Sequence, residues 1–252
     1  KAGSVWVYEI ASGNTRRMTF ENSSSPLFTP RGDFIVYNNG SVVACIRADG
    51  AGTPQVIVKE NYLPESFSPD GQHLILRVLP AGLFVADLEW NASGPKANNV
   101  KPLFPEDKSA TGGNFSPDGK WIAYRSSATG NREVFVRAWP DTGAKYQVSS
   151  SSGGSPVWSK DGKEIFWVSL QGRVMATSYS TQGNAFVVGS TRTATDALVY
   201  TAMPSPVIPT TGNRLLAMTS GTSGKPETNV VFLFHFFDEL KRRLSQAGVK
   251  AE

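Results

Sequence analysis

The stretch NFSPDGKWIAYR, residues 114–125, decides the fold of this chain. A short apolar and aromatic segment leads into the turn Ser-Pro-Asp-Gly, and a β-rich run with alternating apolar residues follows it. The same arrangement recurs in LFTPRGDFIVY from Leu27, SFSPDGQHLILR from Ser66, VWSKDGKEIFWV from Val157 and VIPTTGNRLLAM from Val207. Gaps of 39, 48, 43 and 50 residues separate the five turn glycines. The chain is therefore a repeat protein.

A repeat of this length, built from strands alone, predicts an all-β fold: a β-propeller of four-stranded antiparallel blades. A single blade cannot bury both of its faces, so blades must stack on one another around a central axis. In the third repeat we expect GGNFS to form the inner strand, followed outward by KWIAYRS, REVFVRAW and KYQVS. The second repeat gives HLILRVL, GLFVADLEW and VKPLF after its turn.

We assign residues 1–235 to the propeller and 236–252 to a C-terminal tail, which is either a short helix or a frayed end. Residues 4–20 read as two outer strands of a blade without the inner two, so the propeller begins mid-blade. About five to six blades are present. They either close a ring or form part of a larger one. We favour the larger ring, because the leading and trailing pieces supply more strands than one blade holds.

Composition argues against several classes of function. The net charge of +4 comes from 25 basic and 21 acidic residues that are scattered along the chain, whereas a nucleic-acid-binding protein concentrates its cations. The single cysteine, Cys45, excludes an internal disulfide and a thiolate metal cage. The two histidines, His73 and His235, are far apart in sequence and make a poor metal site. We predict no nucleic-acid partner, no metal and no cofactor.

Three carboxylates recur at matching turn positions and could be mistaken for a catalytic ring. An aspartate before glycine in a tight turn has a local role, because its side chain accepts backbone hydrogen bonds while glycine supplies the positive φ. We therefore predict structural turn residues at Asp70, Gly71, Asp118, Gly119, Asp161 and Gly162.

Candidate ligand-binding residues lie at the opposite end of the blades. Inner strands run toward the Asp-Gly turns, so the other end is formed by connections from outer to inner strands and from second to third strands. Arginine binds carboxylate or phosphate bidentately, and tyrosine stacks or forms hydrogen bonds. The alternative is that these are exposed residues whose ion pairs contribute little. The candidates at this end are Tyr62, Glu65, Arg77, Arg125 and Tyr200.

The FSPDG core with apolar alternation after it resembles the TolB-type β-propeller repeat, which is similar to a WD repeat. The opening VWVYEIASGNTRRMTF resembles the outer strand pair of that family. The ending NVVFLFHFFDELKRRL is similar to the C-terminus of propellers fused to bacterial eukaryotic-type serine/threonine kinases and to some winged-helix regulators. The turns TPRGD and PTTGN depart from the SPDG pattern, so the first and last blades match least well.

The resemblance implies a non-catalytic binding or scaffold propeller, the ligand-sensing or protein-sensing C-terminal part of a larger bacterial signalling protein. A protein or peptide partner is expected first and a small ligand second. It also implies a membrane-anchored parent and a periplasmic or extracytoplasmic location. No Gly-x-Ser-x-Gly nucleophile motif is present, so we predict no catalytic residue and no enzyme.

Two alternatives stay open. One is a hydrolase or lyase with its active site in the propeller pore, which a cluster of His73 or His235 with carboxylates on the upper face would favour. The other is a scaffold of an envelope complex like that of TolB.

Overall fold

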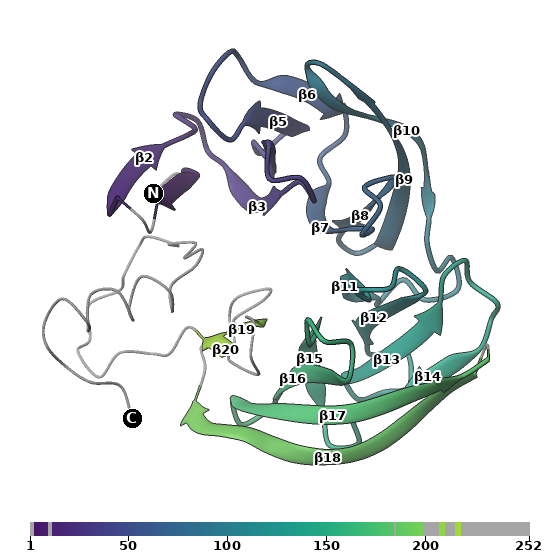
Figure 1. Cartoon of the computed structure of the whole chain (residues 1–252). Coiled ribbons are helices and arrows are strands. Elements are labelled where there is room, and N and C mark those ends of the chain that lie inside the picture. Colours follow the sequence, from purple (N-terminus) through teal and green to yellow (C-terminus); the bar gives the residue numbers. More distant parts are fainter. Residues whose placement is uncertain (1–2, 10–11, 184, 199–206, 210–214, 218–252) are drawn as a thin grey trace, which may run out of the picture.

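The computed structural model describes residues 3–9, 12–183, 185–198, 207–209 and 215–217. The described residues form strands and no helix, and the strands make six antiparallel sheets placed around a common axis (Figure 1). Four sheets have four strands each and two have two strands each. The all-β propeller predicted from the repeats is confirmed. The tail at 236–252 lies outside the described residues.

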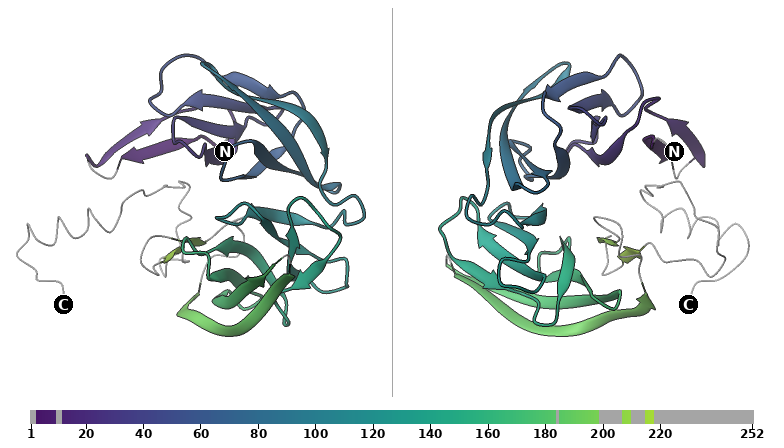
Figure 2. Two further views of the ribbon diagram at one scale, coloured as in Figure 1. Left: turned by 45° about the vertical axis from the view of Figure 1, so that its right-hand side comes forward. Right: turned by 180° about the vertical axis from the view of Figure 1, so that it is seen from behind.

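Four complete blades follow one another in chain order around the axis (Figure 2). Blade 1 comprises β3 (Ser24–Phe28), β4 (Phe34–Asn38), β5 (Val43–Arg47) and β6 (Gln55–Val58). Blade 2 comprises β7 (Leu63–Phe67), β8 (His73–Val78), β9 (Gly82–Asn91) and β10 (Gly94–Pro102). Blade 3 comprises β11 (Thr111–Phe115), β12 (Trp121–Ser126), β13 (Glu133–Ala138) and β14 (Lys145–Gln147). Blade 4 comprises β15 (Gly153–Trp158), β16 (Glu164–Ser169), β17 (Arg173–Gln182) and β18 (Ala185–Leu198).

The two-stranded sheets lie at the two ends of the chain. One pairs β1 (Trp6–Glu9) with β2 (Asn14–Arg17), the half-blade predicted from residues 4–20. The other pairs β19 (Val207–Pro209) with β20 (Leu215–Ala217), within the last repeat. The domain limits at 1–235 and the closure of the ring stay predictions.

Each blade places its first strand nearest the axis and its fourth strand farthest from it (Figure 1). The inner strands β3, β7, β11 and β15 contact one another in that order. The strand order predicted for the third repeat is confirmed. In the second repeat the outer strand begins at Gly94 rather than at Val100, because Gly94 takes φ +116° and reverses the chain directly after β9. A Cβ at Gly94 would lie 3.1 Å from the Cys45 sulfur, and the positive φ is one that other residues rarely adopt, so glycine is favoured there.

The core lies between blades, and the two-residue period of the strands divides it. Leu74 and Leu76 of β8 pack into the cluster shared with blade 1, whereas Ile75 between them packs into the cluster shared with blade 3. Strand β12 repeats this: Tyr124 faces blade 2, and Trp121 faces blade 4. Successive side chains of a strand point to opposite faces, and in blades 2 and 3 a neighbouring blade covers each face. This explains why the middle strands carry continuous apolar runs, such as Leu74–Leu76 in β8 and Trp121–Tyr124 in β12.

The aspartates of the Ser-x-Asp-Gly turns are engaged in local hydrogen bonds. The Ser68 hydroxyl donates to Asp70 Oδ1 over 2.5 Å and accepts the His73 amide over 2.9 Å. The Gln72 amide also donates to Asp70 Oδ1, over 2.9 Å. The same serine-to-aspartate bond joins Ser116 to Asp118 and Ser159 to Asp161. The glycines Gly71, Gly119 and Gly162 have φ of 72°, 72° and 66°.

The turn of the first repeat forms the same hydroxyl-to-carboxylate hydrogen bond with an aspartate at a different position. In TPRGD, Arg31 occupies the aspartate position, and Asp33 accepts the hydroxyl of Thr29 over 2.7 Å instead. Thr29 in turn accepts the Phe34 amide, as the serines do in the other turns. The departure from SPDG therefore preserves both hydrogen bonds of the turn hydroxyl group.

Replacing Asp70 tests the contribution of these turns. Hydrogen bonds from Ser68 and Gln72 lower the pKa of Asp70, so its stabilising effect is present above the unfolded-state pKa of about 4 and is lost as pH falls further. We expect Asp70→Ala to lower the free energy of unfolding by about 1 kcal/mol or less at pH 7, because the turn is solvent-exposed. The difference from the wild type should shrink below about pH 4.

Urea unfolding at pH 7, 5 and 3 measures this effect. Asp70→Asn keeps the acceptor oxygen but does not titrate, so it should show no comparable pH dependence. A destabilisation by Asp70→Ala that is as large at pH 3 as at pH 7 would contradict the assignment.

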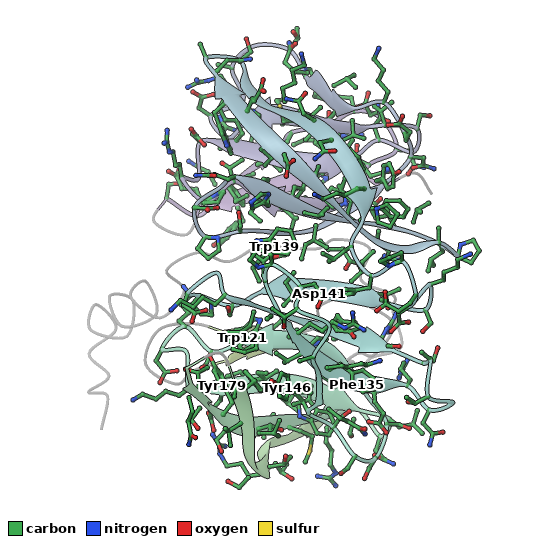
Figure 3. The ribbon with its side chains drawn as sticks, turned by 90° about the vertical axis from the view of Figure 1, so that its right-hand side faces the viewer. Trp121, Phe135, Trp139, Asp141, Tyr146 and Tyr179 are labelled. Atoms are coloured by element: carbon green, nitrogen blue, oxygen red, sulfur yellow. The ribbon has the colours of Figure 1, made fainter. Side chains whose placement is uncertain are left out.

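Two buried tryptophans between blades 3 and 4 differ in one hydrogen bond. Trp158 Nε1 donates to the Asn114 carbonyl over 2.9 Å, whereas Trp121 Nε1 is buried without a hydrogen-bond partner among the described residues. Both rings contact Phe186, Trp121 stands edge-on to Tyr146, and Tyr179 stacks on Phe186, so these rings form an aromatic layer (Figure 3).

We expect Trp158→Phe to destabilise the protein by about 1 kcal/mol more than Trp121→Phe, since only the first loses a hydrogen bond. Guanidinium unfolding of the two variants measures the difference. Equal losses, or a larger loss for Trp121→Phe, would show that ring volume alone decides.

Candidate functional site

The predicted rim residues lie at the ends of blades 2 and 3 that are opposite the Asp-Gly turns. Glu65 is on the inner strand β7, Arg77 is near the end of β8 and Arg125 is near the end of β12. The β8–β9, β10–β11 and β12–β13 connections reach the same end, which we call the upper rim. In blade 3, Arg125 is paired in register with Thr111 at the start of β11.

Glu65 and Arg77 form a buried ion pair that joins two blades. Arg77 Nε donates to Glu65 Oε1 over 2.5 Å. The Arg77 side chain is only 12% exposed and the Glu65 side chain 8%. The other oxygen, Oε2, accepts the amide of Gly113 on β11 over 2.6 Å. Burial raises the pKa of Glu65, and Arg77 and the Gly113 amide oppose this effect. Both oxygens are engaged, so Glu65 positions Arg77 and β11.

Arg125 is oriented by one hydrogen bond and keeps its terminal nitrogens available. Its Nε donates to the Thr111 hydroxyl over 2.7 Å, while Nη1 and Nη2 have no hydrogen-bond partner within the described part of the chain. A Cβ at Gly154 on β15 would lie 3.3 Å from Arg125 Cδ and 3.7 Å from Arg132 Nε. The absence of a side chain at Gly154 thus leaves room for two guanidinium groups. Burial lowers the pKa of Arg125, and the charge of Arg132 lowers it further.

An open cleft of about 490 Å³ lies beside Arg125 at the upper rim. We call it the rim cleft. Its lining combines apolar side chains with cationic and hydroxyl-bearing ones, and Leu79 among the apolar residues is 64% exposed. The residues that line it are Leu79, Pro80, Lys108, Ser109, Thr111, Arg125, Ser127 and Arg132. A site of this kind can hold an anionic group next to an apolar one.

The structure brings together only part of the predicted set. Arg125 lines the rim cleft, whereas Arg77 and Glu65 do not line it but are close enough for their charges to act on Arg125. Tyr62 instead packs against Phe84, with ring centroids 5.2 Å apart, and against the core between blades 1 and 2. Tyr200 lies outside the described residues.

Sequence reasoning missed the loop residues Lys108 and Arg132, together with Ser109 and Ser127. The signal was present, because the predicted topology places the connections that carry them on the same rim as Arg125. The predicted candidates come from strand ends, whereas these four residues lie in the connections between strands.

His73 lies at the opposite end of β8 from Arg77. Its Nδ1 is 3.1 Å from Asp87 Oδ1, and its ring stands edge-on to Trp139 at 5.1 Å. It is therefore paired with a carboxylate at the turn end and not on the upper face. His235 lies outside the described residues. Among those described, no three or more His, Cys, Asp or Glu residues gather where they could hold a metal ion.

Replacing one partner of the buried ion pair should be more harmful than replacing both. Glu65→Met leaves Arg77 buried without its counter-charge, and we expect a loss of about 3–5 kcal/mol in the free energy of unfolding. The double variant Glu65→Met/Arg77→Met removes both charges and should recover at least about 1 kcal/mol of that loss. Chemical denaturation measures both. A double variant no more stable than Glu65→Met would contradict this account.

Comparisons with known proteins bear on the fold. No protein-family model and no curated protein matches the chain. Among solved structures, TolB from Acinetobacter baumannii is 17% identical with a TM-score of 0.53, over 73% of this chain and 51% of that one. A putative 6-phosphogluconolactonase from Bacteroides uniformis is 16% identical with a TM-score of 0.55, over 85% and 69%. The WD40 domain of Toxoplasma gondii coronin is 11% identical with a TM-score of 0.51, over 73% and 49%.

Identities this low carry the fold alone. The chain spans about half the length of the TolB structure that it matches. No helix in the described part of the chain is long and apolar enough to cross a membrane. The repeats, the blade order and these structural neighbours agree: the chain has a TolB-like, WD-repeat-like β-propeller fold.

Proposed function

We propose that this propeller is a non-catalytic binding module that recognises a protein or peptide partner at its upper rim. The observation that carries the proposal is the rim cleft, where oriented donors such as the Arg125 guanidinium stand beside the exposed side chain of Leu79. Protein-binding surfaces commonly combine arginine with exposed apolar side chains. The likeness to TolB and WD40 propellers supports a role in protein interaction.

The composition of the cleft favours binding over catalysis. None of the residues that line it is a carboxylate or a histidine, Lys108 is the one lining residue whose amine could exchange a proton, and Glu65 nearby has both oxygens engaged. A hydrolase or lyase needs a group that can take up or release a proton near the substrate. The likeness to a putative 6-phosphogluconolactonase keeps a pore enzyme as the second candidate.

We extend the proposal to the parent protein and its location. A sensing role in a larger bacterial signalling protein, a membrane-anchored kinase-type parent and an extracytoplasmic location are supported by the resemblance of the sequence. A TolB-like envelope scaffold would use the same rim and would differ in the identity of the partner.

Fluorescence anisotropy with three labelled peptide pools of equal length, one acidic, one neutral and one basic, tests the function. We expect the acidic pool to bind, and Arg125→Gln/Arg132→Gln to weaken its binding about tenfold or more, because charge-assisted hydrogen bonds are lost.

The matched control is Lys120→Gln/Lys160→Gln, which removes the same charge from exposed positions at the turn end. It should change affinity by no more than about twofold, as expected for distant exposed charges. Binding by none of the pools, or equal losses in both double variants, would reject the rim as the partner site.

A further inference from the structure

We propose that the rim cleft binds a phosphate monoester dianion carried by the partner, a phosphorylated serine or threonine next to an apolar residue. This inference rests on the proposed function and names the chemical group that the cleft recognises.

The charges around the cleft do not balance among the described residues. Arg77, Arg125, Arg132 and Lys108 are cationic, whereas the buried carboxylates beside them are Glu65 and Glu133, so two positive charges are left over. Coulomb attraction rises with the charge of the ligand, so this excess favours a dianion over a carboxylate.

A further carboxylate, Asp107, does not restore the balance. It is buried at 3% exposure and pairs with the Lys145 ammonium at 3.4 Å. Its Oδ1 accepts the hydroxyl of Ser109 over 2.8 Å. Because Asp107 already has a cationic partner, the positive charge facing the cleft remains.

The Arg125 guanidinium and the backbone of Arg132 are held in place before any ligand arrives. Thr111 accepts Arg125 Nε and aligns that guanidinium, while the Arg132 carbonyl accepts the Gly153 amide over 2.8 Å and anchors its loop to β15. Arg125 and Arg132 then lie beside the same backbone at Gly154. Two adjacent guanidinium groups supply several donors in planar forks, which match the oxygens of a phosphate. Pre-alignment reduces the entropy lost on binding.

The apolar wall selects the carrier of the phosphate. Leu79, 64% exposed, and Pro80 supply the apolar part of the cleft lining. A phosphopeptide with a neighbouring leucine would cover this wall, whereas a sugar phosphate would leave it in water. A polyanion such as nucleic acid is disfavoured as the ligand. The other cations of the chain are scattered along the sequence and do not form a continuous basic surface with the cleft.

Isothermal titration calorimetry at pH 8 and constant ionic strength provides the first test, with inorganic phosphate, sulfate and acetate as probes. We expect phosphate and sulfate to bind and acetate to bind about tenfold more weakly or worse. Arg132→Gln and Arg125→Gln should each weaken phosphate binding about tenfold. Arg132 is exposed, so its variant tests the site even if Arg125→Gln is destabilised.

Lys120→Gln/Lys160→Gln is again the matched control and should bind phosphate like the wild type. Phosphate affinity that is equal in the arginine variants and in this control would overturn the proposal, as would equal affinity for acetate and phosphate.

The second test distinguishes the source of the phosphate. We expect a phosphoserine-leucine peptide to bind at least tenfold more tightly than its unphosphorylated form and than glucose 6-phosphate. Leu79→Ala should weaken the phosphopeptide but not inorganic phosphate. Tighter binding of the sugar phosphate, or no effect of Leu79→Ala, would overturn the peptide as the carrier.

The two proposals fail in different ways. If unphosphorylated acidic peptides bind through Arg125 and Arg132 but phosphate does not displace them, the partner function stands and the phosphate inference is wrong. If phosphate binds through those arginines and no peptide does, the phosphate site stands and the partner function is wrong.

Discussion

The structure depends on one constraint: every complete blade must be covered on both faces. In β8, Leu74 and Leu76 serve the interface with blade 1 while Ile75 serves the interface with blade 3. Burying both sets removes a large apolar area from water, and neither set is buried in an isolated blade. The blade is therefore the unit of the repeat, and the interface between blades is the unit of stability.

This constraint also decides where polar chemistry can lie. The faces of the blades are filled mainly by apolar side chains. Charged side chains that could meet a ligand therefore lie at the rims, where connections from neighbouring blades meet, and on the exposed outer strands. The Glu65–Arg77 pair is the exception that joins the two regions, because its carboxylate reaches the Gly113 amide of the next blade. It fixes the seam between blades 2 and 3 beside which the rim cleft opens. The cleft is thus a product of stacking, built from residues far apart in the chain.

The sequence predicts features that depend on local contacts and misses those that depend on a neighbouring blade. The turn signal is local, since Ser68, Asp70 and Gly71 bond within a few residues, and the repeats therefore reveal the fold without any tertiary information. Strand ends such as Arg125 can be placed from the strand order. Tyr62 could not, because whether an aromatic side chain at the rim points to solvent or packs on Phe84 depends on the neighbouring blade. Arg132 and Lys108 lie in loops whose geometry no periodic pattern describes.

The rim cleft contains the clearest local conflict among the described residues. Arg125 is partly buried beside Arg132, and burial together with like charge disfavours its charged form. A sequence selected only for stability would place a neutral residue there, or a second carboxylate. Natural proteins keep such conflicts mainly where function requires them. Thr111 and Glu65 limit the cost by orienting the cations without neutralising all of them. The remaining positive charge is then available to a ligand, and an anion that enters the cleft would relieve the repulsion that folding leaves in place.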